Sequence, residues 1–229
     1  MLSRQKYLIQ DFKALVKSPE IEVIAFDIYD TLLTRKVLPE QMHYLWAQNI
    51  KKNFSLKKSE KEIVSKKFQA MKIVKLKNVI KGKDREYEYA DMLYILYKII
   101  KINIDFHEFA RACLEIEEKL EKEMCYRYEK GFELYRIACN SRVKLICISD
   151  FYLSKTIVKN VMIKNGYHFD DIFISCDFLL SKRSGRLYQK VSKQLECKPV
   201  QMLMIGDNEH SDYCMAKKQG MKAICISHY

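Results

Sequence analysis

The stretch Glu22–Leu33, EVIAFDIYDTLL, places two acids directly after a run of apolar and β-branched residues. Residues 21–26 are apolar throughout most of their length and too few for a helix, so they predict a buried strand. Asp27 then stands at the carboxyl end of that strand, and Asp30 follows closely. An acid at a strand end indicates either a turn or a site where a carboxylate does chemistry. The rest of the chain decides between the two.

Long helices are predicted for the segment from Pro39 to Asn140, because apolar residues recur there at three- and four-residue spacing. Pro39 suits a first helical turn, and Ser59 with Glu62 forms a capping-box pattern. Asp105 is a further candidate helix cap. Strand patterns are absent over about a hundred residues, so we expect an all-helical block.

Strands alternate with helices after this block. Short apolar runs typical of buried strands lie at 143–149, 171–176, 200–207 and 222–227. Helical segments separate these runs, which predicts right-handed β-α-β crossovers and a mainly parallel sheet. The helical block interrupts the alternation directly after the first strand, so we interpret it as an inserted cap domain.

The composition is that of a globular protein, with 48% hydrophobic and 31% charged residues in a chain of 229. The formal net charge of +12 is compatible with a solvated lysine-rich surface or with a patch that attracts anionic molecules. The lysines are spread over helical segments such as 57–83, which favours the first interpretation. No G-x-G-x-x-G or Walker pattern occurs, and we expect no nucleic-acid partner.

The eight cysteines contain no C-x-x-C pair, and Cys147 and Cys225 lie inside apolar runs. They therefore resemble small buried hydrophobic residues in a reducing compartment. The first residues carry charges where a signal peptide would be apolar. No apolar run approaches the ~20 residues of a membrane span. We therefore expect a cytoplasmic protein without a membrane span.

Chemically active side chains follow several predicted strands where each strand ends. The carboxyl ends of parallel strands meet at one edge of a sheet, and functional groups collect there. Each residue alone has a simpler explanation as a turn, a helix cap or a surface residue. Their agreement in order, strand position and residue type favours a common site. The residues are Asp27, Ser149, Asp150, Lys182, Asp207 and Asp212.

Four motifs in this order resemble those of the haloacid dehalogenase-like (HAD) hydrolase superfamily. They are FDIYDTLL at 26–33, ICISD at 146–150, Lys182 within SKRSGRLY, and IGDNEHSD at 205–212. More narrowly, FDIYDTLLTR with ISDFYLS is similar to a bacterial subgroup of predicted HAD hydrolases. Some members of that subgroup accompany glycosyltransferases in surface-polysaccharide loci. The four motifs indicate the superfamily and say little about the substrate.

The resemblance implies a fold as well as a chemistry. We expect an α/β protein with a Rossmann-like three-layer α/β/α core, whose parallel sheet has the strand order 5-4-1-2-3. An all-helical cap would be inserted after strand 1, the position of the superfamily's first cap type. The core would comprise residues 1–33 and 141–229, and the cap residues 34–140.

The resemblance also implies roles for the residues at the strand ends. Asp27 would attack phosphorus and form an acyl phosphate, which divides one difficult displacement into two easier ones. Mg²⁺, which prefers oxygen ligands in near-octahedral geometry, would be the cofactor. Its protein ligands would be Asp27, the backbone oxygen of Tyr29, Asp207 and Asp212, with Asn208 as an alternative outer partner.

The remaining site residues would bind the substrate or neutralise charge. Ser149 would hydrogen-bond a phosphoryl oxygen, and Lys182 would offset negative charge on Asp27 and on the phosphoryl group. Thr31 and Asp150 are further candidate substrate-binding residues. The expected substrate is a small phosphorylated metabolite such as a sugar phosphate. The cap would close over this phosphomonoester and exclude water.

Tyr29 departs from the pattern of the superfamily's phosphatases, which carry an acid–base aspartate two residues after the nucleophile. Asp30 does not realign into that role, because the nucleophile would then be Ile28. One interpretation is a phosphatase whose proton donor is Asp30, a cap residue or water. Loss of a general acid typically lowers the rate ~10²–10⁴-fold, and less for an activated leaving group.

Two other interpretations of Tyr29 stay open. A 2-haloacid dehalogenase also carries a tyrosine at this position, but it needs no metal and lacks the acidic pattern of motif four. The retention of Asp207 and Asp212 argues against this interpretation. The third interpretation is a degenerate domain that binds a phosphorylated ligand or a protein partner without turnover.

Overall fold

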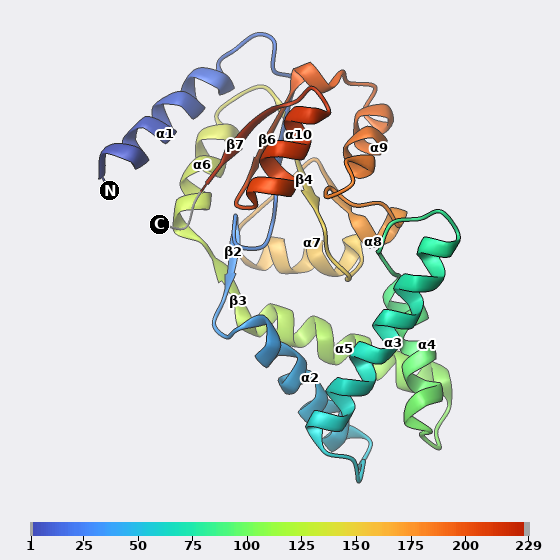
Figure 1. The fold of residues 1–229 in the computed structure, drawn as a ribbon. Helices are drawn as coiled ribbons and strands as arrows, with labels where there is room; N and C mark the ends of the chain where they lie inside the picture. The colour runs from blue at the N-terminus through green and yellow to red at the C-terminus, as the bar shows by residue number, and fades with distance from the viewer. Residues whose placement is uncertain (1, 227–229) are drawn as a thin grey trace.

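A five-stranded parallel sheet forms the centre of the computed structural model, which describes residues 2–226 (Figure 1). Its strands are β1 (Val23–Phe26), β4 (Lys144–Ser149), β5 (Asp171–Ile174), β6 (Met202–Gly206) and β7 (Lys222–Cys225). Their order in the sheet is β5-β4-β1-β6-β7. When the five strands are numbered 1 to 5 along the chain and the sheet is read from β7, this is the expected order 5-4-1-2-3. Residues 227–229, including the end of the last expected strand, lie outside the described residues.

Alternate side chains of β1 enter two separate apolar clusters, one on each face of the sheet. Ile24 and Phe26 belong to the first cluster, whereas Val23 and Ala25 belong to the second. This alternation follows from the two-residue period of a strand. Helices cover both faces, as a parallel sheet requires, so the three-layer α/β/α core is confirmed. The first face carries α1 (Leu2–Val16), α6 (Glu129–Cys139) and α7 (Lys155–Lys164), and the second carries α9 (Arg186–Gln194) and α10 (Met215–Lys218).

Four further helices form a separate group at the lower right of Figure 1. They are α2 (Pro39–Asn53), α3 (Glu60–Ile80), α4 (Tyr89–Ile100) and α5 (Phe106–Met124). The expected caps are present: the Ser59 hydroxyl accepts from the Glu62 backbone N–H, and the Asp105 carboxylate accepts from the first turn of α5. This group is the helical insertion predicted after the first strand.

Two short strands correct the prediction that residues 34–140 are all-helical. β2 (Leu33–Arg35) and β3 (Cys125–Arg127) pair antiparallel on either side of the cap helices. Each strand has only three residues, so neither shows the two-residue alternation by which a strand is recognised. Their partners are about ninety residues apart in the chain, so the pairing depends on the tertiary fold.

Helix α6 lies with the core and not with the cap helices. It packs against α1, and its Tyr135 contacts the rings of Tyr167 and Phe169 from the core. Gly131 lets α6 also approach the segment after β1 closely, because a Cβ there would lie 1.9 Å from the Thr31 carbonyl oxygen. The boundary at residue 140 stays a prediction, and the packing of α6 favours one near Met124.

Short elements complete the fold around the carboxyl edge of the sheet. They are α8 (Ser175–Phe178), the 3₁₀ turn η1 (Pro199–Gln201) and the π-helical turn η2 (Glu209–Cys214). Within the described part of the chain, every helix is too short or too polar to span a bilayer.

A buried ion pair lies at the centre of the cap. Lys67 Nζ, on α3, is 3.0 Å from a carboxylate oxygen of Glu117, on α5, and 4.0 Å from the centre of the Trp46 ring. The hydroxyls of Tyr89 and Tyr152 each donate to the same carboxylate at 2.6 Å. Burial raises the pKa of Glu117, but Lys67 and the two hydroxyls outweigh it and hold this pKa below its usual value. Tyr152 belongs to the core, so this pair also fastens the cap to the core.

Replacing Lys67 by methionine should leave the Glu117 carboxylate buried without a counter-charge. We expect the free energy of unfolding to fall by about 3–5 kcal/mol. Lys72→Met, at an exposed position of the same helix, should change it by less than about 0.5 kcal/mol. Urea unfolding of both variants measures the difference, and equal losses would contradict the proposed importance of the buried pair.

Candidate active site

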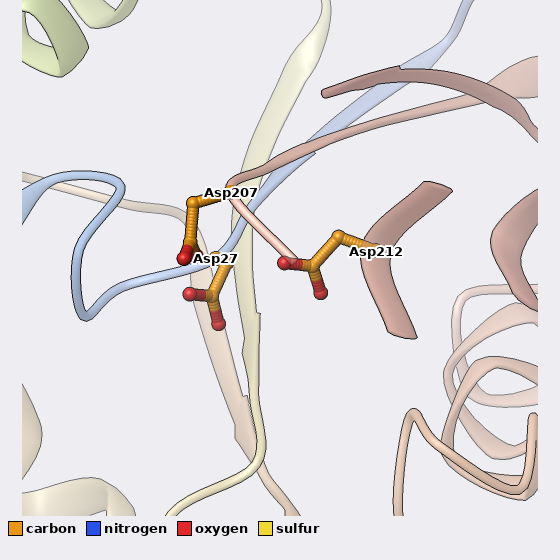
Figure 2. A group of neighbouring side chains, drawn as sticks. All are labelled: Asp27, Asp207 and Asp212. Carbon is orange, nitrogen blue, oxygen red and sulfur yellow. The ribbon is translucent and has the colours of Figure 1, made fainter. Parts of the chain in front are cut away.

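Three aspartates meet at the carboxyl edge of the sheet (Figure 2). Asp27 directly follows β1, and its backbone N–H donates to the Ile205 carbonyl of β6 at 2.8 Å. Asp207 directly follows β6, and Asp212 lies in η2. One carboxylate oxygen from each aspartate lies within 4.8 Å of the others. Oxygen donors at this spacing suit a single divalent cation such as Mg²⁺.

Lys182 bridges two of these carboxylates. Its Nζ donates to Asp27 Oδ1 at 2.5 Å and to Asp212 Oδ1 at 2.6 Å, and its side chain is only 3% exposed. Burial alone would lower the pKa of Lys182, but the two carboxylates raise it well above its usual value. Lys182 therefore stays charged. Burial also raises the pKa of Asp27, to about 7, although Lys182 opposes that shift.

Gly206 and Asn208 hold Asp212 in this position. A Cβ on Gly206 would lie 2.2 Å from Asp212 Oδ2, so only glycine leaves room for the carboxylate. The Asn208 backbone N–H donates to the same oxygen at 3.1 Å, and the Asn208 side chain caps η2. Of the two residues considered from the sequence, Asp212 therefore joins the aspartate cluster, and Asn208 holds the Asp212 carboxylate in place.

Thr31 contacts the same cluster. Its hydroxyl donates to Asp207 Oδ1 at 3.2 Å and lies 3.5 Å from Asp27 Oδ2. Burial raises the pKa of Asp207, and the nearby Asp212 raises it further. The structure thus places Thr31 as a link between two carboxylates, and its direct contact with a substrate stays a prediction.

Asp150 fixes the loop that carries Lys182. Its two carboxylate oxygens accept from the backbone N–H groups of Lys182 at 2.7 Å and Arg183 at 3.3 Å. Burial raises the pKa of Asp150, although Lys182 partly opposes this shift. The geometry favours a positioning role for Asp150 over the predicted contact with substrate. Ser149 is buried beside it and lines the cavity described below.

Asp30 and Tyr29 point in different directions at the end of motif one. Asp30 has a left-handed backbone with φ of 59°, which aspartate tolerates better than most residues, and it is exposed at the cavity. The Tyr29 hydroxyl instead donates to Glu121 Oε2 of the cap at 3.1 Å. Burial, followed by the Glu121 charge, raises the pKa of Tyr29 well above its usual value. Tyr29 therefore joins core to cap and is a poor proton donor.

Several residues near Tyr29 were not predicted from the sequence. The Arg35 guanidinium lies 4.1 Å above the Tyr29 ring, and the Phe151 ring packs against Tyr29 at 4.2 Å. Glu121 also accepts from Arg35 and from the Cys125 thiol. The unusual Phe-Tyr pair after Asp150 in motif two was the available signal, since nothing in a solvated loop requires two aromatic residues.

A loop of the cap docks beside Lys182, and this contact was also missed. The Asp84 carboxylate accepts from the Ser181 backbone N–H at 2.7 Å and from the Ser184 hydroxyl, and it pairs with Arg186 at 3.0 Å. Nearby, the Ser175 hydroxyl donates to Glu86 Oε2 at 2.8 Å. The cap thus holds the same loop that Asp150 holds from the core.

The cluster opens into a cavity of about 910 Å³ between core and cap. Every predicted catalytic residue lines this cavity, as do Tyr29, Asp150, Asp207 and Asp212; Thr31 is buried and is not part of the lining. Cap residues complete the wall. They are Lys75, Val79, Lys83, Asp84, Arg85 and Glu86. The volume admits a small metabolite.

The sequence matches the haloacid dehalogenase-like hydrolase family over residues 21–220, most of the chain. The chain belongs to this family. The match covers all four motifs and the inserted cap. A comparison with curated proteins finds no match.

Solved structures share the HAD fold at low sequence identity. A 2-haloacid dehalogenase from Pseudomonas syringae is 13% identical with a TM-score of 0.61, and the match covers 90% of this chain and 86% of that one. The HAD hydrolase YfnB from Bacillus subtilis, bound to magnesium, is 13% identical with a TM-score of 0.57, covering 90% and 86%. A HAD family enzyme from Bacteroides thetaiotaomicron, in complex with magnesium and inorganic phosphate, is 12% identical with a TM-score of 0.58, covering 90% and 93%. These likenesses support the fold.

Asp27 should make the metal-free protein less stable as the pH rises. Its pKa is about 7 in the folded state, above the usual 3.8, so the folded state holds a proton that the unfolded state releases between these values. Asp27→Asn should therefore raise the free energy of unfolding at pH 8, by about 1–4 kcal/mol, with little gain near pH 4.

Urea unfolding with a chelator present, at several pH values, measures this gain. Asp105→Asn is the control, because the exposed Asp105 carboxylate has its pKa lowered by the helix N–H groups it caps. That variant should show no gain at high pH. A gain for Asp27→Asn that does not depend on pH would contradict the expectation.

Proposed function

We propose that this HAD hydrolase is a Mg²⁺-dependent phosphatase that cleaves a small phosphomonoester through an aspartyl-phosphate intermediate. The observation that carries the proposal is the grouping of Asp27, Asp207 and Asp212 around buried Lys182. Two HAD structures of similar fold contain magnesium, one of them with inorganic phosphate. A cytoplasmic location and a sugar phosphate substrate remain predictions that accompany this proposal.

Asp27 performs the chemical step in this mechanism. A carboxylate oxygen of Asp27 forms a bond to phosphorus while the bond to the ester oxygen breaks, and water then hydrolyses the acyl phosphate and restores the carboxylate. Mg²⁺ held by Asp27, Asp207, Asp212 and the Tyr29 carbonyl would neutralise charge between the two approaching anions. Lys182 balances the charge of Asp27 and faces the phosphoryl group, and Ser149 donates to a phosphoryl oxygen.

The leaving oxygen needs a proton or a stabilising charge. Tyr29 does not supply the proton, because its hydroxyl is committed to Glu121 and its pKa is raised. Asp30 is the proposed donor, since it is exposed at the cavity beside the position that an acid usually occupies. Substrates with activated leaving groups should depend on Asp30 less than alkyl phosphates do.

Hydrolysis of an aryl phosphate tests the proposal. We expect turnover that requires Mg²⁺, is abolished in Asp27→Asn, and falls about 10²–10⁴-fold for an alkyl phosphate in Asp30→Asn. Lys72→Met, at an exposed position that is not part of the cavity lining, serves as the folded control. No turnover of a broad panel of phosphomonoesters by folded, magnesium-loaded protein would reject the phosphatase and favour a ligand-binding module.

Dehalogenation of a 2-haloacid is the second candidate reaction. Tyr29 at the acid position and the similar fold of a 2-haloacid dehalogenase favour it. In that reaction Asp27 would attack carbon and displace halide as an ester forms, with no metal needed.

Halide release from a 2-haloacid in the presence of a chelator separates the two reactions. We expect none, because without a metal ion Lys182 alone would offset the charges of Asp27, Asp207 and Asp212 beside an anionic substrate. Metal-independent halide release that is lost in Asp27→Asn would establish the dehalogenase instead.

A further inference from the structure

More cations line the cavity than the phosphoryl site uses. Its lining cations are Arg35, Lys75, Lys83, Arg85, Lys182 and Arg183. Lys182 is committed to Asp27 and Asp212. Four other lining cations make no ion pair within 4 Å with any carboxylate among residues 9–226. They are Lys75, Lys83, Arg85 and Arg183. Seven carboxylates line the same cavity, so these cations supply local positive charge rather than a net positive potential.

Arg35 differs from these four cations because it is mostly buried and held in place. Its side chain is 13% exposed, and its guanidinium lies 4.1 Å from the centre of the Tyr29 ring and 5.8 Å from that of Phe151. Its backbone is paired with Cys125 in the β2–β3 sheet. A cation fixed in this way loses little conformational freedom when it binds a ligand.

The guanidinium of Arg35 is also incompletely bonded. Its Nε is buried and has no hydrogen-bond partner among the described residues. Within the part of the chain that the structure describes, its one ion pair, from Nη2 to Glu121, is long at 3.5 Å. A guanidinium has five N–H donors in a planar fork that matches a carboxylate or phosphate, and a buried donor without a partner is unfavourable. A ligand oxyanion would accept from those donors of the fork that face the cavity.

Arg35 reaches the cavity beside Tyr29, and Tyr29 follows Asp27 by two positions in the chain. A group bound to Arg35 would therefore lie in the same cavity as the reacting phosphoryl group without being that group, because the proposed phosphoryl site is formed by Lys182 and the aspartates. Glu121, which belongs to the cap, balances the charge of Arg35, so the guanidinium is not left buried without a counter-charge before a ligand binds.

We propose that the substrate carries a second anionic group, a carboxylate or a phosphate, and that Arg35 binds it as a specificity residue. The proposal rests on the proposed function for the identity of the first group. It narrows the expected substrate from the phosphate ester of an uncharged sugar to a small metabolite that carries a second oxyanion besides the phosphoryl ester. Lys75, Lys83, Arg85 and Arg183 would favour entry of such a molecule.

Matched ligands test this proposal without requiring turnover. In the full chain carrying Asp27→Asn, calorimetry compares a phosphomonoester bearing a carboxylate with its isosteric carboxamide, and an alkanediol bisphosphate with its monophosphate. We expect the anionic member of at least one pair to bind about 10–100-fold more tightly. The pair that shows the preference identifies the anion as carboxylate or phosphate.

Variants at Arg35 assign the preference to this residue. Arg35→Met combined with Glu121→Gln removes both charges, so no uncompensated carboxylate is left to unfold the cap. This double variant should lose the preference and bind the neutral ligands as before. Arg35→Lys should retain part of it, because lysine keeps the charge and lacks the planar fork.

Arg127→Met is the control, because Arg127 lies on the adjacent strand over the Phe132 ring and pairs with exposed Glu129, outside the cavity. It should keep the full preference. Equal binding within both pairs, or an unchanged preference in the double variant, would overturn the role of Arg35. An Arg35-dependent preference in a protein that hydrolyses no phosphomonoester would reject the phosphatase and leave the anion-binding role of Arg35 standing.

Discussion

The contact of Lys182 with Asp27 and Asp212 is the interaction on which the site depends. Three carboxylates at one sheet edge repel each other, and burial makes their charged forms still less favourable. A single buried ammonium within 2.6 Å of two of them makes the arrangement tolerable. The sheet brings the aspartates together through its parallel strands, but the position of Lys182 has to be fixed separately because it lies on a loop.

That loop is held from two directions. Asp150 of the core accepts from its backbone, and Asp84 of the cap accepts from Ser181 and Ser184. The cap is fastened in turn by Tyr152, which reaches Glu117 in the centre of the cap, and by Tyr29, which reaches Glu121. The placement of Lys182 and the placement of the cap are therefore coupled. This coupling gives a physical reason for the Asp-Phe-Tyr run after β4.

Local patterns predicted the parts of this structure that depend on neighbours in the chain. The apolar runs predicted the strands, helical spacing predicted the cap helices, and Ser59 and Asp105 predicted two helix starts, whereas the strand order came from the family resemblance. The β2–β3 pair, the position of α6 and the docking of Asp84 were not predicted. The strand pair and the Asp84 contact each join segments that lie about ninety residues or more from each other in the chain. Helix α6 is placed by aromatic contacts with the core.

The sequence by itself determined that acids and a lysine follow the strands of a parallel sheet, because strand polarity sends every carboxyl end to the same edge. It also determined that the usual acid is replaced by Tyr29. Only the tertiary structure decided what Tyr29 does instead, since its partners Glu121 and Arg35 come from the cap and from a three-residue strand. The exposed charges, the incompletely bonded guanidinium and the shape of the cavity follow from packing between distant segments, which no local pattern records.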